Sequence, residues 1–150
     1  MADPTLFQNG YVAATTATGG ATYTVLSGIK SASAPYSMAE LDEAVMGDTV
    51  EAKYPGIISA PISVTLRQDF TSAAAGVDKL TYTRFAARSA FRVKIRAVNA
   101  AVSATNPSYL YSKVRIHNVT PIDGSHGALL ENKVEFRPQS TCTITRSTTT

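Results

Sequence analysis

The chain has 150 residues, of which 44% are hydrophobic and 17% charged, and its formal net charge is +3. This length suits one domain with a core of its own, and the composition is that of a folded protein, which excludes global disorder. We therefore expect residues 1–150 to form a single domain with flexible N-terminal and C-terminal ends.

Cysteine usage and the N-terminal residues indicate where such a chain folds. The lone cysteine, Cys142, excludes an internal disulfide and fits folding in a reducing cytoplasm. The first residues, Met-Ala-Asp-Pro-Thr-Leu, lack the basic and apolar regions of a secretory signal peptide. No apolar run approaches the roughly 18 residues that a membrane-spanning helix needs, so we expect no membrane insertion.

The first 60 residues predict two strand segments and one long excursion. Asn9-Gly10 is a strong turn dipeptide, which indicates either a short hairpin or a turn followed by a strand over residues 6–16. Residues 21–30 form the next strand, whose buried face the pattern leaves ambiguous. Residues 31–59 are too long for an ordinary connection; such a segment is functional, disordered or carries strands of its own.

The rest of the chain predicts further strands and one helix. Apolar and polar residues alternate in segments that we interpret as strands: 61–69, 91–97, 110–120, 130–137 and 141–146, the last an edge strand. Pro121 ends the third of these, and Asn106-Pro107 closes the loop before it. Asp78 is a plausible N-cap for a short helix over about 79–88 with Leu80 packed on the sheet, although 80–85 as a strand is an alternative.

Short strands separated by turn residues are typical of a mainly β protein. We predict a β-sandwich or half-barrel with one short α-helix and a long extended loop or hairpin over about residues 31–59.

The charges divide unevenly along the chain. Residues 1–66 carry two basic and six acidic residues, and the remainder carries twelve basic and five acidic ones. A solvated surface explains this division, as do complementary patches that meet between identical subunits. Basic residues Arg92, Lys94 and Arg96 share one face of their strand while Phe91 lies on the other, so we expect no aromatic platform beside these charges.

Catalytic patterns in the sequence are weak. Gly124-Ser125-His126-Gly127 sets a hydroxyl beside an imidazole, but the nucleophile elbow needs Gly-x-Ser-x-Gly, so we interpret this segment as a turn. Nothing near Cys142 or His117 indicates an activated thiol, and no histidine or cysteine pair has metal-ligand spacing. We therefore predict no enzyme, no metal and no cofactor.

Three segments in order carry a resemblance to a known family. They are Glu40-Leu-Asp-Glu-Ala-Val-Met-Gly-Asp-Thr-Val, Ala60-Pro-Ile-Ser-Val-Thr-Leu-Arg-Gln-Asp69, and the block Arg92–Gly127 with its Val-Ser-Ala-Thr-Asn-Pro loop and Pro-Ile-Asp-Gly-Ser-His-Gly turn. With these segments in order, the chain resembles the tail tube (major tail) proteins of long-tailed bacteriophages, and the resemblance extends over roughly residues 22 to 137.

The resemblance implies a structural virion protein that assembles into stacked hexameric rings, forming the tube through which DNA passes into the host. It implies assembly in the bacterial cytoplasm, a location in the virion tail, and contacts with tape-measure, tail terminator and distal tail proteins. The excursion would reach a neighbouring subunit. The expected subunit-interface residues are Glu40, Asp42, Glu43, Met46, Asp48, Glu51, Arg67, Arg88 and Arg92.

Other functions are consistent with parts of the sequence. A head-tail connector or capsid decoration protein is an alternative within the structural class. A nucleic-acid-binding β domain is the alternative outside it, because the second half of the chain is basic. An enzyme would require a closed pocket joining His117, His126 and Cys142.

Overall fold

The computed structural model describes residues 10–15, 19–43, 52–70 and 76–149. The elements in chain order are β1 (Tyr11–Thr15), β2 (Tyr23–Val25), β3 (Ile29–Ser33), β4 (Ser37–Glu43), β5 (Ala52–Ser59), β6 (Ile62–Arg67), α1 (Val77–Ala87), β7 (Phe91–Arg96), β8 (Ser108–Asp123), β9 (Glu131–Pro138) and β10 (Ile144–Ser147). The predicted Asn9-Gly10 turn involves residues outside the described ranges; β1 follows it.

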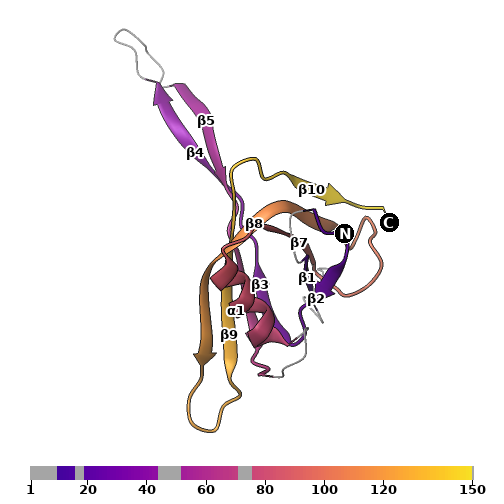
Figure 1. Ribbon diagram of the computed structural model, residues 1–150. Helices are drawn as coiled ribbons and strands as arrows, with labels where there is room; N and C mark the ends of the chain where they lie inside the picture. Colours follow the sequence, from indigo (N-terminus) through magenta and orange to yellow (C-terminus); the bar gives the residue numbers. More distant parts are fainter. Residues whose placement is uncertain (1–9, 16–18, 44–51, 71–75, 150) are drawn as a thin grey trace.

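One antiparallel sheet forms most of the body. Its strand order is β2-β1-β7-β8-β9-β6-β3, and β10 pairs with β8. Strands β2 and β3 lie at opposite ends of this order, yet only residues 26–28 connect them in sequence. The sheet must therefore curl until its ends approach each other, as Figure 1 shows. This confirms the predicted mainly β half-barrel.

The sequence pattern of residues 21–30 conceals a break between two strands. Gly28 has a φ of +69°, a conformation that glycine adopts without strain, and it directly precedes β3. A Cβ atom at this position would lie 3.0 Å from the Cβ atom of Arg67. The prediction of one strand here is wrong, because the chain turns at Gly28 and crosses from one end of the sheet to the other.

Alternating apolar residues fill the interior of the half-barrel. The predicted buried faces of β6 and β7 are confirmed, and the rings of Phe91 and Phe136 meet edge to face with centroids 5.9 Å apart. The core side chains are Val12, Ala14, Leu26, Ala60, Ile62, Val64, Leu66, Val77, Phe91, Val93, Ile95, Tyr111, Val114, Ile116, Val134 and Phe136.

Strand β8 extends past the proline that was expected to end it. The β7–β8 register ends at the pair Phe91↔Val114, and the β8–β9 register is irregular between Thr120 and Asp123. Pro121 lies in that irregular stretch, where the ladder does not use a backbone N–H. The predicted strand end at Pro121 is therefore wrong.

Helix α1 packs on the sheet through polar as well as apolar residues. Leu80 contacts the core as predicted, and Asn132 of β9 is fully buried and donates from Nδ2 to Thr81 Oγ1 and Gln68 Oε1, both at 3.3 Å. The residue at the N-cap is Gly76, and Asp78 lies in the first turn. The predicted cap at Asp78 and the alternative of a strand over 80–85 are wrong.

The side chain of Asn106 makes several hydrogen bonds to the backbone of the loop between β7 and β8. Asn106 accepts from the backbone N of Val98 through Oδ1 at 3.2 Å. Its Nδ2 donates to the backbone oxygens of Val98 at 3.1 Å, Ala101 at 3.2 Å and Ala100 at 3.4 Å. This buried amide closes the loop that Asn106-Pro107 marks in the sequence.

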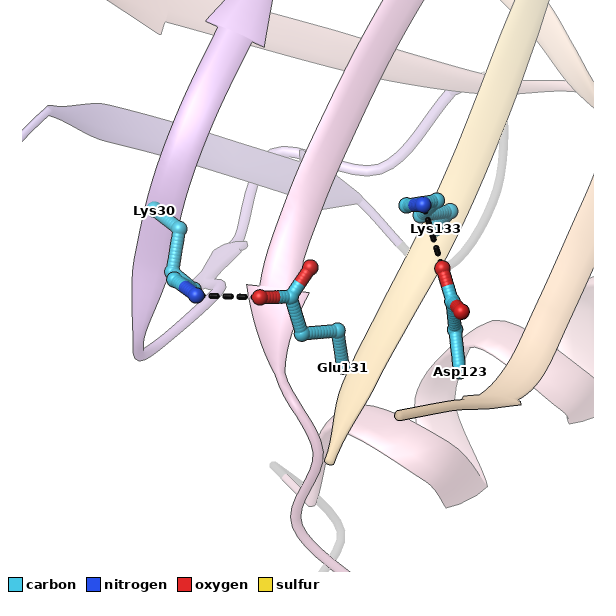
Figure 2. A network of polar contacts seen from close by, with 4 residues as sticks. All are labelled: Lys30, Asp123, Glu131 and Lys133. Atoms are coloured by element: carbon cyan, nitrogen blue, oxygen red, sulfur yellow. Dashed lines mark hydrogen bonds and ion pairs between the residues drawn. The ribbon is translucent and has the colours of Figure 1, made fainter. Parts of the chain in front are cut away.

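Ion pairs link strands on the outside of the sheet, one of them across an intervening strand. Lys30 of β3 contacts Glu131 at the start of β9, and Lys133 of β9 contacts Asp123 at the end of β8 (Figure 2). The Asp123 carboxylate raises the pKa of Lys133 through a hydrogen bond and charge attraction. These pairs are solvent-exposed, so we expect each to contribute little to stability.

Candidate assembly interface

Strands β4 and β5 form a hairpin, here called the arm, that projects away from the half-barrel (Figure 1). They pair with each other and with no other described strand. The register shifts between Met38 and Glu40, where β5 carries an extra residue. Gly56 is required there, because an added Cβ atom would lie 2.8 Å from the backbone oxygen of Ala39. Of the loop or hairpin predicted over about residues 31–59, paired strands are confirmed at Ser37–Glu43 and Ala52–Ser59, whereas residues 31–33 belong to β3 of the main sheet.

Two of the acidic residues predicted at the interface meet a lysine of the same arm. Lys53 Nζ lies 3.3 Å from Glu40 Oε2 and 3.7 Å from Asp42 Oδ1. All three side chains are at least half exposed, so the group keeps contact with solvent and a net negative charge. The side chain of Glu43 and the residues Met46, Asp48 and Glu51 lie outside what the structure describes.

The basic residues predicted as partners of the arm lie on three different elements. Arg67 ends β6 and is exposed, and Arg88 follows α1 with a φ of 52°. Arg92 lies in β7 and is half-buried. Among the described residues of one chain, these three arginines form no ion pair with the arm. Their pairing with a neighbouring subunit stays a prediction.

Large apolar side chains on the arm are the feature that the sequence interpretation missed. Leu41 and Tyr54 form a cross-strand pair on one face and are 58% and 55% exposed. Met38 and Ile58 pair on the opposite face, and Ile57 in the bulge is 86% exposed. The sequence signal for this apolar surface is the Tyr-Pro-Gly-Ile-Ile segment of β5. The sequence interpretation gave more weight to the neighbouring carboxylates. Apolar residues exposed together on both faces mark an interaction surface.

Tyrosine rings connect the root of the arm to the body. The Tyr111 hydroxyl donates to the Tyr36 hydroxyl at 3.2 Å, and the two rings are nearly parallel at 15° with centroids 6.4 Å apart. Tyr109 also packs against Tyr36. Burial, and then the hydrogen bond to Tyr36, raise the pKa of Tyr111. These contacts fix the direction in which the arm leaves the half-barrel.

Tyrosines from neighbouring strands cover the basic face of β7. The guanidinium of Arg96 lies 3.7 Å from the ring centroid of Tyr11, and Lys94 Nζ lies 4.6 Å from that of Tyr23. The expectation that aromatic rings would be absent from this face is wrong, because β1 and β2 supply them. Each cation occupies a ring face on which a nucleic-acid base would stack.

The segment that suggested catalysis is a turn, as predicted. Gly127 has a φ of +81°, and Ala128 N donates to Ser125 O at 3.0 Å between β8 and β9. Among the described residues, no group of three His, Cys, Asp or Glu side chains is placed to hold a metal ion. No helix within the described ranges is long and apolar enough to cross a membrane.

Solved structures of tubular tails share this fold. A chain in the tail of an empty gene transfer agent particle, determined with C6 symmetry, is 13% identical with a TM-score of 0.66, over 90% of this chain and 94% of that one. The SPP1 tail tube matches with 9% identity and a TM-score of 0.72, over 97% and 80%. The tube-terminating cap of the anti-feeding prophage matches with 14% identity and a TM-score of 0.64, over 98% and 94%.

The chain therefore shares its fold with proteins from these tubular assemblies. Within that group the chain has the fold of tail tube proteins, as its resemblance to phage tail tubes implied. No protein-family model matches the sequence, and a comparison with curated proteins finds no match. At these sequence identities the structural likeness shows the fold alone.

Proposed function

We propose that this chain is a structural virion protein that assembles into stacked hexameric rings and forms a phage tail tube. The arm is the observation that carries this proposal: five large apolar side chains lie exposed on a hairpin that pairs with no other described strand. Burying apolar surface contributes about 25 cal/mol per Å², so covering the arm with a neighbouring subunit stabilises the assembly. The tail-tube fold supports the same conclusion.

Open sheet edges support ring formation as well. Strands β2 and β3 end the sheet order, and each pairs with one described strand. An exposed edge presents unpaired backbone N–H and C=O groups that a strand from another subunit can satisfy. A ring of subunits therefore uses hydrogen-bonding groups that a single chain leaves to water.

The proposed tube has several further partners. Tape-measure, tail terminator and distal tail proteins contact its lumen or its ends, and genomic DNA passes through without specific binding. The protein lies in the virion tail after assembly in the bacterial cytoplasm. It catalyses no reaction and holds no cofactor.

Negative-stain electron microscopy of the purified chain over a concentration series tests this function. Wild type is expected to form rings and open-ended tubes, whereas the double variant Leu41→Ser/Tyr54→Ser stays monomeric. Ile122→Ser is the matched control, because Ile122 is 65% exposed but lies on β8, away from the arm. Monomers at every wild-type concentration, or tubes of the arm variant at wild-type concentration, would contradict the proposal.

Electron microscopy and DNA binding at different salt concentrations separate the alternatives. A head-tail connector stops at a single ring, and a capsid decoration protein forms no tube. A nucleic-acid-binding domain would retain affinity for a DNA duplex at moderate salt, whereas incidental contact by the basic face of β7 falls steeply between 50 and 200 mM salt, by about 10³-fold for six phosphate contacts.

A further inference from the structure

A cavity of about 300 Å³ opens at the root of the arm. We call it the root pocket; its lining includes Ala32, Ala34, Ile95, Arg96, Ala97 and Tyr109. These residues come from the end of β3, the end of β7 and the start of β8. The pocket is therefore the mouth of the half-barrel on the side from which the arm leaves.

Small side chains leave this end of the core unfilled. Three of the lining residues are alanines, and Ala32 and Ala34 pack against the core without closing it. An apolar cavity of about 150 Å³ already accommodates benzene, so the root pocket has room for a large aliphatic or aromatic side chain. Because the pocket is open to solvent, its apolar lining lies in contact with water, and a partner's apolar side chain that covers this lining removes that contact.

We propose that the root pocket receives the Leu41/Tyr54 pair from the arm of a second copy of this chain. This contact rests on the proposed tube function and names the surface that the arm binds. Both side chains project from one face of the arm and are more than half exposed. They supply the apolar surface that the pocket lacks.

Charge complementarity favours this occupant. Glu40 and Asp42 flank Leu41 in β4 and project from the opposite face of the arm, where with Lys53 they form a group of net negative charge. Arg96 lines the pocket, and its guanidinium is held in place by the Tyr11 ring and the backbone oxygen of Ala100. An arm that inserts its apolar pair therefore brings this net negative charge, carried on the face turned away from the pocket, within about a Debye length of a fixed cation, so the two attract at long range without forming an ion pair.

The arm fills the pocket of another copy and not its own. Tyr36 lines the pocket and stacks on Tyr111, which directs the arm outward from the mouth (Figure 1). Leu41 and Tyr54 lie farther along the arm than this anchor. Arm and pocket are different surfaces, so the contact is head to tail and repeats from copy to copy.

Filling the pocket tests the contact. Ala97→Leu is expected to raise the concentration at which tubes form by about tenfold or more, equivalent to about 1.4 kcal/mol. Ala101→Leu makes the same change at an exposed loop position and is expected to assemble as wild type does. Circular dichroism of both variants reports whether the monomer still folds. Tubes of a folded Ala97→Leu variant at the wild-type concentration would overturn the proposal.

Disulfide trapping keeps the test decisive if Ala97→Leu unfolds. In a Cys142→Ala background, Leu41→Cys/Ala97→Cys is expected to give a ladder of linked chains under mild oxidation. Mixed single-cysteine chains are expected to stop at dimers, and the control pair Ile122→Cys/Ala97→Cys to stay unlinked. Linkage within one chain, or no linkage, overturns the pocket contact. If wild type forms tubes but the cysteine pair gives no ladder, the pocket contact is rejected and the tube function stands. If the cysteine pair gives a ladder but wild type forms no tubes, the tube function is rejected and the pocket contact stands.

Discussion

Replacing Arg84 by methionine is expected to stabilise the folded chain. Arg84 lies on α1 and is 7% exposed, and neither Nη1 nor Nη2 has a hydrogen-bond partner. Its guanidinium lies over the Phe91 ring, 4.8 Å from the centroid. A buried charge without an acceptor opposes folding, and methionine keeps the apolar stem while removing that charge.

The magnitude follows from two opposing contributions. Burial lowers the pKa of Arg84 from its ordinary range to about 10, which corresponds to an upper bound of about 3 kcal/mol against the charged form. The cation–π contact with Phe91 offsets about 1–2 kcal/mol of this. We therefore expect Arg84→Met to raise the free energy of unfolding by about 1–2 kcal/mol and the melting temperature by about 3–6 °C.

Urea unfolding of the monomer, followed by far-ultraviolet circular dichroism, measures this difference. Arg88→Met is the matched control, because it makes the same substitution at an exposed position just after α1. We expect its effect to stay within about 0.5 kcal/mol. A loss of about 1 kcal/mol or more in Arg84→Met would refute the reasoning, because it would mean that the charge stabilises the fold.

Three further changes probe the arm root, the β7–β8 loop and the arm itself. Because the pKa of Tyr111 is raised in the folded chain, the unfolded chain loses the phenol proton near pH 10 while the folded chain keeps it. The free energy of unfolding therefore falls as the pH rises above about 10. Tyr111→Phe is expected to remove up to 1.36 kcal/mol per pH unit of this decrease, measured by urea unfolding at several pH values. Asn106→Asp places a carboxylate against backbone oxygens and is expected to cost about 2 kcal/mol, measured by thermal unfolding. Gly56→Ala forces its Cβ atom against Ala39 and is expected to destabilise the arm by about 1 kcal/mol or more, measured as faster amide exchange in β4 and β5.

Matched changes control two of these experiments. Asn99→Asp alters an exposed residue of the same loop and is expected to leave stability unchanged. Gly19→Ala adds a Cβ atom that meets nothing within 4 Å, and exchange in the arm should match wild type. If the free energy of unfolding falls equally steeply above about pH 10 in wild type and Tyr111→Phe, the Tyr111 prediction is contradicted. If Asn106→Asp or Gly56→Ala loses no more stability than its control, the corresponding prediction is contradicted.

Local patterns predicted the strands, and long-range neighbours decided what the patterns could not. The alternation of Phe91, Val93 and Ile95 sets the buried face of β7 whatever lies beside it, so that prediction is confirmed. Tyr11 and Tyr23 are far from β7 in sequence, and the strand order alone brings them over its charges. A single-strand pattern contains no information about such partners.

In the candidate interface, too, local sequence predicted some residues and long-range contacts decided others. Glu40 and Asp42 are recognisable because charges cluster in a long excursion, and length alone indicated a hairpin or loop there. The importance of Leu41 and Tyr54 depends on whether the body covers them, which only the direction of the arm decides. That direction is set at Tyr36, whose partner Tyr111 lies 75 residues away.

The two halves of the sheet can join during synthesis only after strand β8 has been made. In the described sheet, β2, β1 and β7 lie on one side of β8, and β9, β6 and β3 lie on the other. β8 begins at residue 108, so most of the chain has left the ribosome before the two halves have a common partner. Pairings of such high sequence separation form slowly. Early fragments are therefore expected to expose the strand edges that later pair with β8 and β9, and exposed edges favour premature association.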